Sequence, residues 1–184
     1  MPVEPRVFLC YGRPDREAAA ALSKCFWEHQ MECYDYLAKP IEDRLETELP
    51  HTSYIFAVKV FVALISFESA ERQLVIEELQ MAAGMKRLNP ELIRIYVCPP
   101  EFMLPEKRPF MLNPGVFTSS VQVPIDDHPE LYIDRTRVGT AEELCAEIIR
   151  AIPQETLNKI NEAWEINKQL YPDQFDEKQK EYLR

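Results

Sequence analysis

Short apolar runs recur along the chain at the lengths expected of β-strands. Five of them stand out: VFLCY (7–11), ECYDYL (32–37), KVFVALIS (59–66), LIRIYVC (92–98) and LYIDR (131–135). The third run is apolar over six consecutive residues, as expected for a strand that is covered on both faces of a parallel sheet. This pattern predicts about five strands, of which KVFVALIS is the strongest.

Between these runs, apolar residues recur every three to four positions, which predicts amphipathic helices. The helix predicted over 16–29 has one apolar side, formed by Ala18, Leu22, Cys25 and Phe26. Further helices are predicted over 42–49, over a segment after Ser66 that ends near Gly84, and over 140–152, and the last begins with a capping box of Thr140 and Glu143. Because strands and helices alternate, we expect an α/β domain over 1–152 with a flavodoxin-like, doubly wound parallel sheet.

The composition becomes more polar after Pro153. An apolar stripe is formed by Leu157, Ile160 and Trp164, with Ile166 as a further candidate. This predicts a C-terminal helical extension over 153–184 that ends in a charged tail. The extension either packs on the domain or connects it to a partner or to further sequence, and the sequence leaves both open.

Charge and cysteine content exclude several classes of function. The net charge of −10 argues against direct contact with nucleic acid or with an anionic membrane, and no apolar run is long enough to span one. We see no export signal, and the five scattered cysteines are typical of reduced, buried thiols, so we expect a cytoplasmic protein. Metal-ligand spacing is absent, so we expect no metal site and no bound cofactor.

In a sheet of this class, ligands bind beyond the carboxyl ends of the strands, where the strand order reverses. The residues predicted there are Tyr11, Gly12 and Arg13 after the first strand and Ser66 after the third, with the loop AKPIED (38–43) on the same edge. No GxGxxG or GxxxxGK[ST] motif is present, and the chain has only four glycines. A dinucleotide-binding Rossmann site is therefore excluded.

The helix after the third strand contains two adjacent glutamates. At about 100° per residue, Val75, Leu79, Ala82 and Ala83 share one side. Glu77 lies opposite this side and is predicted to face solvent, whereas Glu78 lies at the margin of the apolar side. A carboxylate in that position is either paired with a nearby cation or borders a water-filled cleft.

The order of these features resembles that of Toll/interleukin-1 receptor (TIR) domains. VFLCYGRPDREAAAALSKCF resembles their first strand and helix, AKPIEDRL resembles their BB loop, and YIDR…AEELCAEIIRAI is similar to their last strand and helix. In VALISFES…LVIEEL, a serine ends the strand and a glutamate followed by an aliphatic residue comes in the next helix. The chain departs from the family at Leu74, where TIR enzymes often have tryptophan, and in a BB loop that lacks glycine.

The resemblance implies cleavage of the nicotinamide–ribose bond of NAD⁺, the substrate, with activity switched on by self-association in defence or cell-death signalling. Glu78 takes the register of the family's catalytic glutamate. The resemblance implies that the substrate is lined by Tyr11, Gly12, Arg13, Ile41, Ser66 and Leu74. The sequence leaves open whether the product is linear or cyclic. Two alternatives are a non-catalytic TIR interaction module and an enzyme resembling nucleoside deoxyribosyltransferases.

Overall fold

A computed structural model describes residues 6–34, 55, 57–85, 89–103 and 130–182. Its centre is a sheet of five strands, β1 (Val7–Tyr11), β2 (Cys33–Tyr34), β3 (Val60–Leu64), β4 (Ile93–Cys98) and β5 (Glu130–Asp134). All four strand pairings are parallel, and the order across the sheet is β2-β1-β3-β4-β5. The prediction of a five-stranded, flavodoxin-like parallel sheet is confirmed. The predicted helix over 42–49 and the BB loop lie outside the described residues.

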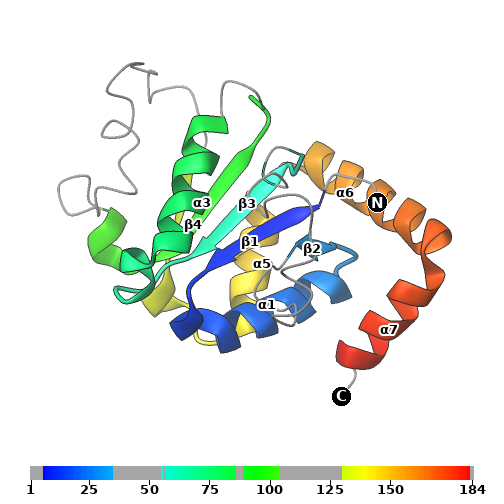
Figure 1. Cartoon of the computed structure of the whole chain (residues 1–184), viewed down its shortest axis with the longest axis horizontal. Helices are drawn as coiled ribbons and strands as arrows, with labels where there is room; N and C mark the ends of the chain where they lie inside the picture. Colours follow the sequence, from blue (N-terminus) through cyan, green and yellow to red (C-terminus); the bar gives the residue numbers. More distant parts are fainter. Residues whose placement is uncertain (1–5, 35–54, 56, 86–88, 104–129, 183–184) are drawn as a thin grey trace.

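Both faces of the sheet are covered, because side chains alternate between them along each strand. Helices α1 (Arg16–Glu28) and α5 (Ala141–Ala151) pack on one face against Leu9, Val62 and Ile95. Helix α3 (Gln73–Gly84) packs on the other face, in a separate core that includes Cys10 and Ala63. Figure 1 shows α3 and α1 on opposite sides of the strands.

The helix boundaries lie close to the predicted ones, but the predicted position of Ala18 on the sheet-facing side of α1 is wrong. In α1 the buried residues include Ala19, Leu22, Cys25 and Phe26, whereas Ala18 is exposed. The predicted capping box is present at α5, where the Thr140 hydroxyl accepts from the Glu143 N–H at 3.1 Å and the Glu143 carboxylate accepts from the Thr140 N–H at 3.3 Å.

The C-terminal extension is a pair of helices, α6 (Gln154–Leu170) and α7 (Pro172–Tyr182), which lie beside the β2 edge (Figure 1). The segment predicted as a charged tail is therefore helical. Phe175 of α7 packs on Trp27 of α1 and on Trp164 of α6, with ring centroids 4.9 and 4.8 Å away. Trp164 belongs to the buried stripe as predicted, but Ile166 is 43% exposed.

Glu32, just before β2, joins the extension to the sheet by polar contacts. Its carboxylate accepts from Arg6 at 3.2 Å, from Asn167 of α6 at 3.0 Å and from Lys178 of α7 at 3.3 Å. Arg6 and Glu32 precede β1 and β2, so this network lies at the amino ends of the strands. The extension is thus attached away from the carboxyl edge, where ligands bind in this fold.

Candidate functional site

The strand order places the switch point of the sheet between β1 and β3. The chain leaves β1 toward α1 on one face and leaves β3 toward α3 on the other. The loops that follow the two strands therefore diverge at this point, which is the usual position of a ligand site in a doubly wound sheet. The candidate site is built from these two loops and from the first turns of α3.

Asp15 connects the two loops through a buried carboxylate. Its Oδ2 accepts a hydrogen bond from the Ser66 hydroxyl at 3.0 Å, and its Oδ1 accepts from Arg135, just after β5, at 2.5 Å. Asp15 is also the N-cap residue of α1, but its side chain makes no capping hydrogen bond there. An aspartate at this position usually caps its own helix, so here the carboxylate instead ties β1, β3 and β5 together at their carboxyl ends.

Gly12 lies in direct contact with the β3 loop. A Cβ atom at Gly12 would lie 2.7 Å from the Ser69 Cβ and 3.1 Å from its Cα, closer than side-chain carbons approach one another. Ser69 is fully buried, and its hydroxyl accepts from the Ser66 N–H at 2.7 Å. The gap at the switch point is therefore filled by Ser69, and Gly12 is required by this close approach and not by its backbone angles, which are extended.

The two glutamates of α3 occupy different environments. Glu77 is exposed, as predicted, and its carboxylate accepts a hydrogen bond from Gln73 at 2.8 Å. Glu78 is only 3% exposed, so it lies deeper than the margin of the apolar side. It lies beside the Cys10 thiol of β1, and the pKa of that thiol is raised by burial and, to a smaller extent, by the charge of Glu78 and a hydrogen bond to it.

The structure brings some of the predicted site residues together and separates others. The loops that carry Gly12 and Ser66 meet at the switch point, where Gly12 contacts Ser69 and Ser66 donates to Asp15; Arg13, next to Gly12, is exposed. Tyr11 is buried in the core under α1 and α5, on the face opposite Glu78. Leu74 is half-buried in the first turn of α3, and Ile41 lies outside the described residues.

The Ser66 hydroxyl is engaged in structural hydrogen bonds with Asp15 and Ser69. Besides donating to Asp15, it accepts from the Ser69 N–H at 3.1 Å, in the manner of a serine that caps a following turn. Ser66, which the resemblance places against the substrate, therefore has a local capping role in the structure. Asp15, Ser69 and Arg135 were missed as members of the site, because their contacts join segments that are far apart in the sequence.

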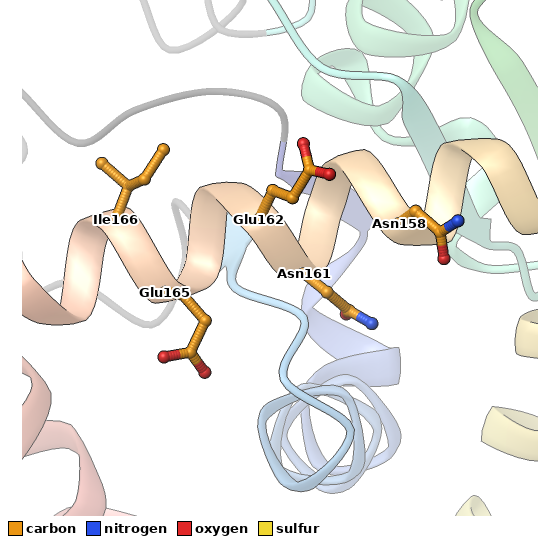
Figure 2. Close-up of a pocket in the computed structure, with 5 residues that line it drawn as sticks. All are labelled: Asn158, Asn161, Glu162, Glu165 and Ile166. Atoms are coloured by element: carbon orange, nitrogen blue, oxygen red, sulfur yellow. The ribbon is translucent and has the colours of Figure 1, made fainter.

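A shallow hollow of about 630 Å³ lies elsewhere, on the outer side of α6 (Figure 2). It is lined by Asn158, Asn161, Glu162, Glu165 and Ile166. Figure 2 shows Glu162 and Ile166 extending from one side of the helix and Asn161 and Glu165 from the other. Because one helix supplies all of these residues, the hollow is an open depression on the surface. We therefore do not place the functional site there.

Comparison with known protein families and with curated proteins finds no match to this chain. Among the described residues, no group of three or more histidines, cysteines, aspartates or glutamates is placed to hold a metal ion. None of the described helices combines the length and apolar character that crossing a membrane requires.

Proposed function

We propose that the protein is an NAD⁺ glycohydrolase of the TIR type, in which Glu78 acts on the ribose attached to nicotinamide. The observation that carries the proposal is that the Glu78 carboxylate is buried on the inner side of α3 while the adjacent Glu77 faces solvent. Burial of a carboxylate costs free energy, and such groups are concentrated at functional sites. The position agrees with the family register of the catalytic glutamate.

The proposed reaction breaks the bond between the nicotinamide nitrogen and C1′ of the ribose. Nicotinamide leaves as a neutral pyridine that retains the bonding electron pair, so no general acid is needed. Water attacks C1′ and loses a proton, which gives ADP-ribose, and attack by a nitrogen of the adenine ring gives a cyclic product. In both cases positive charge develops on the ribose, and a nearby carboxylate stabilises it in a partly dry site.

The burial of Glu78 also bears on regulation. Glu78 is only 3% exposed, so a ribose cannot contact its carboxylate without a rearrangement of the groups that cover it. We therefore propose that the isolated chain is a resting form, and that self-association favours the form in which Glu78 is accessible. Self-association as the activating step rests on the family resemblance.

A second function, from another class, is favoured by the same burial. Leu74 stands where TIR enzymes often have tryptophan. In a non-catalytic TIR interaction module, Glu78 would have a structural role, such as its buried contact with Cys10. Such a module signals through contacts between copies and consumes no substrate.

Incubation of the purified protein with NAD⁺, with and without a crowding agent, separates the two functions. The proposal predicts release of nicotinamide, resolved by chromatography, at a rate that rises when crowding promotes assembly. Parallel incubations with deoxynucleosides test the alternative of base exchange. Self-association without any loss of NAD⁺ would contradict the enzymatic proposal and support the interaction module.

A further inference from the structure

The turn between β3 and α3 is held to the end of β1 by side-chain contacts. Ser69, in the 3₁₀ turn Ser69–Glu71, lies directly against Gly12, and its hydroxyl accepts a hydrogen bond from the Ser66 N–H at 2.7 Å. The Ser66 hydroxyl in turn donates to the Asp15 carboxylate at 3.0 Å. Because α3 begins just after this turn, the contacts of Asp15 fix the segment from which the helix starts.

This turn and α3 cover the Cys10 thiol and the Glu78 carboxylate. Cys10 is fully buried, and Ala70 of the turn and Leu79 of α3 belong to the same core. The pKa of Cys10 is raised most by burial and further by the charges of Glu78 and Asp15, so both carboxylates lie near this thiol. A separation of the turn from β1 would therefore expose Cys10 to solvent.

The buried carboxylate of Asp15 is neutralised by a cation that solvent can reach. The Asp15 side chain is 1% exposed, and its Oδ1 accepts from Nη1 of Arg135, in the turn after β5, at 2.5 Å. The Arg135 side chain is 33% exposed. A buried carboxylate that loses its cation is strongly destabilised unless water reaches it. Local opening at the switch point supplies that water, so loss of Arg135 favours the open form.

We propose that Arg135 is a positioning residue: through Asp15 and Ser66 it holds the turn between β3 and α3 against β1, and so keeps Glu78 covered in the resting form. Release of Arg135 lets this turn and the start of α3 move away from β1. An ion pair at the surface thus controls the accessibility of a carboxylate on another element. The consequence for catalysis, access of a ribose to Glu78, rests on the proposed function.

Alkylation of Cys10 by N-ethylmaleimide, resolved by mass spectrometry, measures how often the turn opens. Cys25 of α1 and Cys145 of α5 lie in the other core and report global unfolding. Arg135→Gln should raise the labelling rate of Cys10 about 10- to 100-fold, as expected for loss of a hydrogen bond between charged groups, and leave Cys25 and Cys145 unchanged. Arg137→Gln is the matched control and should leave Cys10 unchanged, because Arg137 is 85% exposed and pairs with the aspartate that begins its own turn.

A double variant tests whether the buried charge is the cause of opening. Asp15→Asn combined with Arg135→Gln removes this charge together with its cation, and the amide of the new side chain can still accept from Ser66. Replacement of both partners of a buried pair costs much less than removal of one. The labelling rate of Cys10 should therefore return toward that of the unmodified protein. Labelling as fast as in Arg135→Gln alone would overturn the proposal.

Two further outcomes of the labelling experiment would also overturn it. These are an unchanged rate at Cys10 in Arg135→Gln, and an equal increase at Cys10, Cys25 and Cys145. A second measurement does not depend on the folding of any variant. In the unmodified protein at sub-denaturing urea concentrations, Cys10 should be labelled before Cys25 and Cys145, and simultaneous labelling contradicts the proposal.

The proposed function fails separately from this inference. If both hold, Arg135→Gln should cleave NAD⁺ without a crowding agent, at a rate that the unmodified protein reaches only when assembled. Selective labelling of Cys10 without NAD⁺ cleavage under any condition keeps the positioning role of Arg135 and loses the enzymatic proposal. Cleavage that rises with crowding, in a protein whose Cys10 is never labelled selectively, has the opposite meaning.

Discussion

Replacement of Gly12 by alanine should destabilise the protein, although the backbone there is compatible with any residue. Gly12 has φ −91° and ψ 165°, so alanine introduces no backbone strain. The added methyl group, however, lies 2.7 Å from the Ser69 Cβ, and Ser69 is held by hydrogen bonds to both the N–H and the C=O of Ser66. Because the close atoms are the Cβ and the backbone Cα of Ser69, which cannot rotate away, the cost of overpacking falls in the upper part of its usual range, about 2–3 kcal/mol.

The loss of unfolded-state entropy on Gly→Ala replacement offsets about 0.5–1 kcal/mol of that cost. The net expectation for Gly12→Ala is a decrease of about 1–2.5 kcal/mol in the free energy of unfolding, or roughly 2–10 °C in Tm for a chain of this size. Urea unfolding followed by tryptophan fluorescence measures it. Gly84→Ala is the matched control: no atom lies within 4 Å of the position that its added methyl group would take, so this helix-end variant should gain up to about 0.5 kcal/mol. A Gly12→Ala variant as stable as the unmodified protein would refute the close packing at the switch point.

Two further predictions concern the extension and a buried thiol. Phe175→Ala should release α7, because Phe175 is the aromatic side chain of that helix that lies between Trp27 and Trp164; limited proteolysis should then cut within 172–182, whereas Ile166→Ala should leave the segment resistant. Unchanged proteolysis of Phe175→Ala would show that the contacts of Lys178, Gln179 and Tyr182 suffice to hold α7. Burial raises the pKa of Cys145 from 9.0 to about 12, so the folded state keeps a proton that the unfolded chain loses. This contribution to stability is complete below pH 9 and is lost between about pH 9 and 12. The stability difference between the unmodified protein and Cys145→Ala, measured by urea unfolding from pH 8 to 11, should therefore shrink as the pH rises, and a constant difference would contradict the assignment.

The sheet could be predicted because the signals that specify its strands are local in the sequence. Each strand is a short apolar run, and the alternation of strands with helices leaves few possible topologies. The error at Ala18 has a simple cause: Ala18 and Ala19 are chemically identical neighbours, and only packing against the sheet decides which one is buried. The burial of Ile166 was overestimated because an apolar residue at the margin of a stripe can face either the core or the solvent.

The contacts that hold the candidate site together could not be predicted in the same way. Asp15 and Arg135 are 120 residues apart, and nothing in the local pattern of either segment indicates the other. The same holds for Phe175, an isolated aromatic residue in a polar segment whose partner Trp27 lies on α1. In contrast, helical spacing alone predicts that Glu77 and Glu78 differ in exposure, because the two residues lie about 100° apart around α3, although it placed Glu78 at the margin of the apolar side and not within it.

The central claim is that the buried glutamate of α3 carries out the chemistry. The most direct measurement is the rate of nicotinamide release from NAD⁺ by Glu78→Gln compared with Glu77→Gln, in assembled protein and with both variants shown to be folded by urea unfolding. The two variants carry the same substitution at adjacent positions, one buried and one exposed. We predict that Glu77→Gln retains the rate of the unmodified protein and that Glu78→Gln loses it by about 10²–10³-fold, as expected when a group that stabilises a developing charge is removed. Equal rates for the two folded variants would contradict the claim.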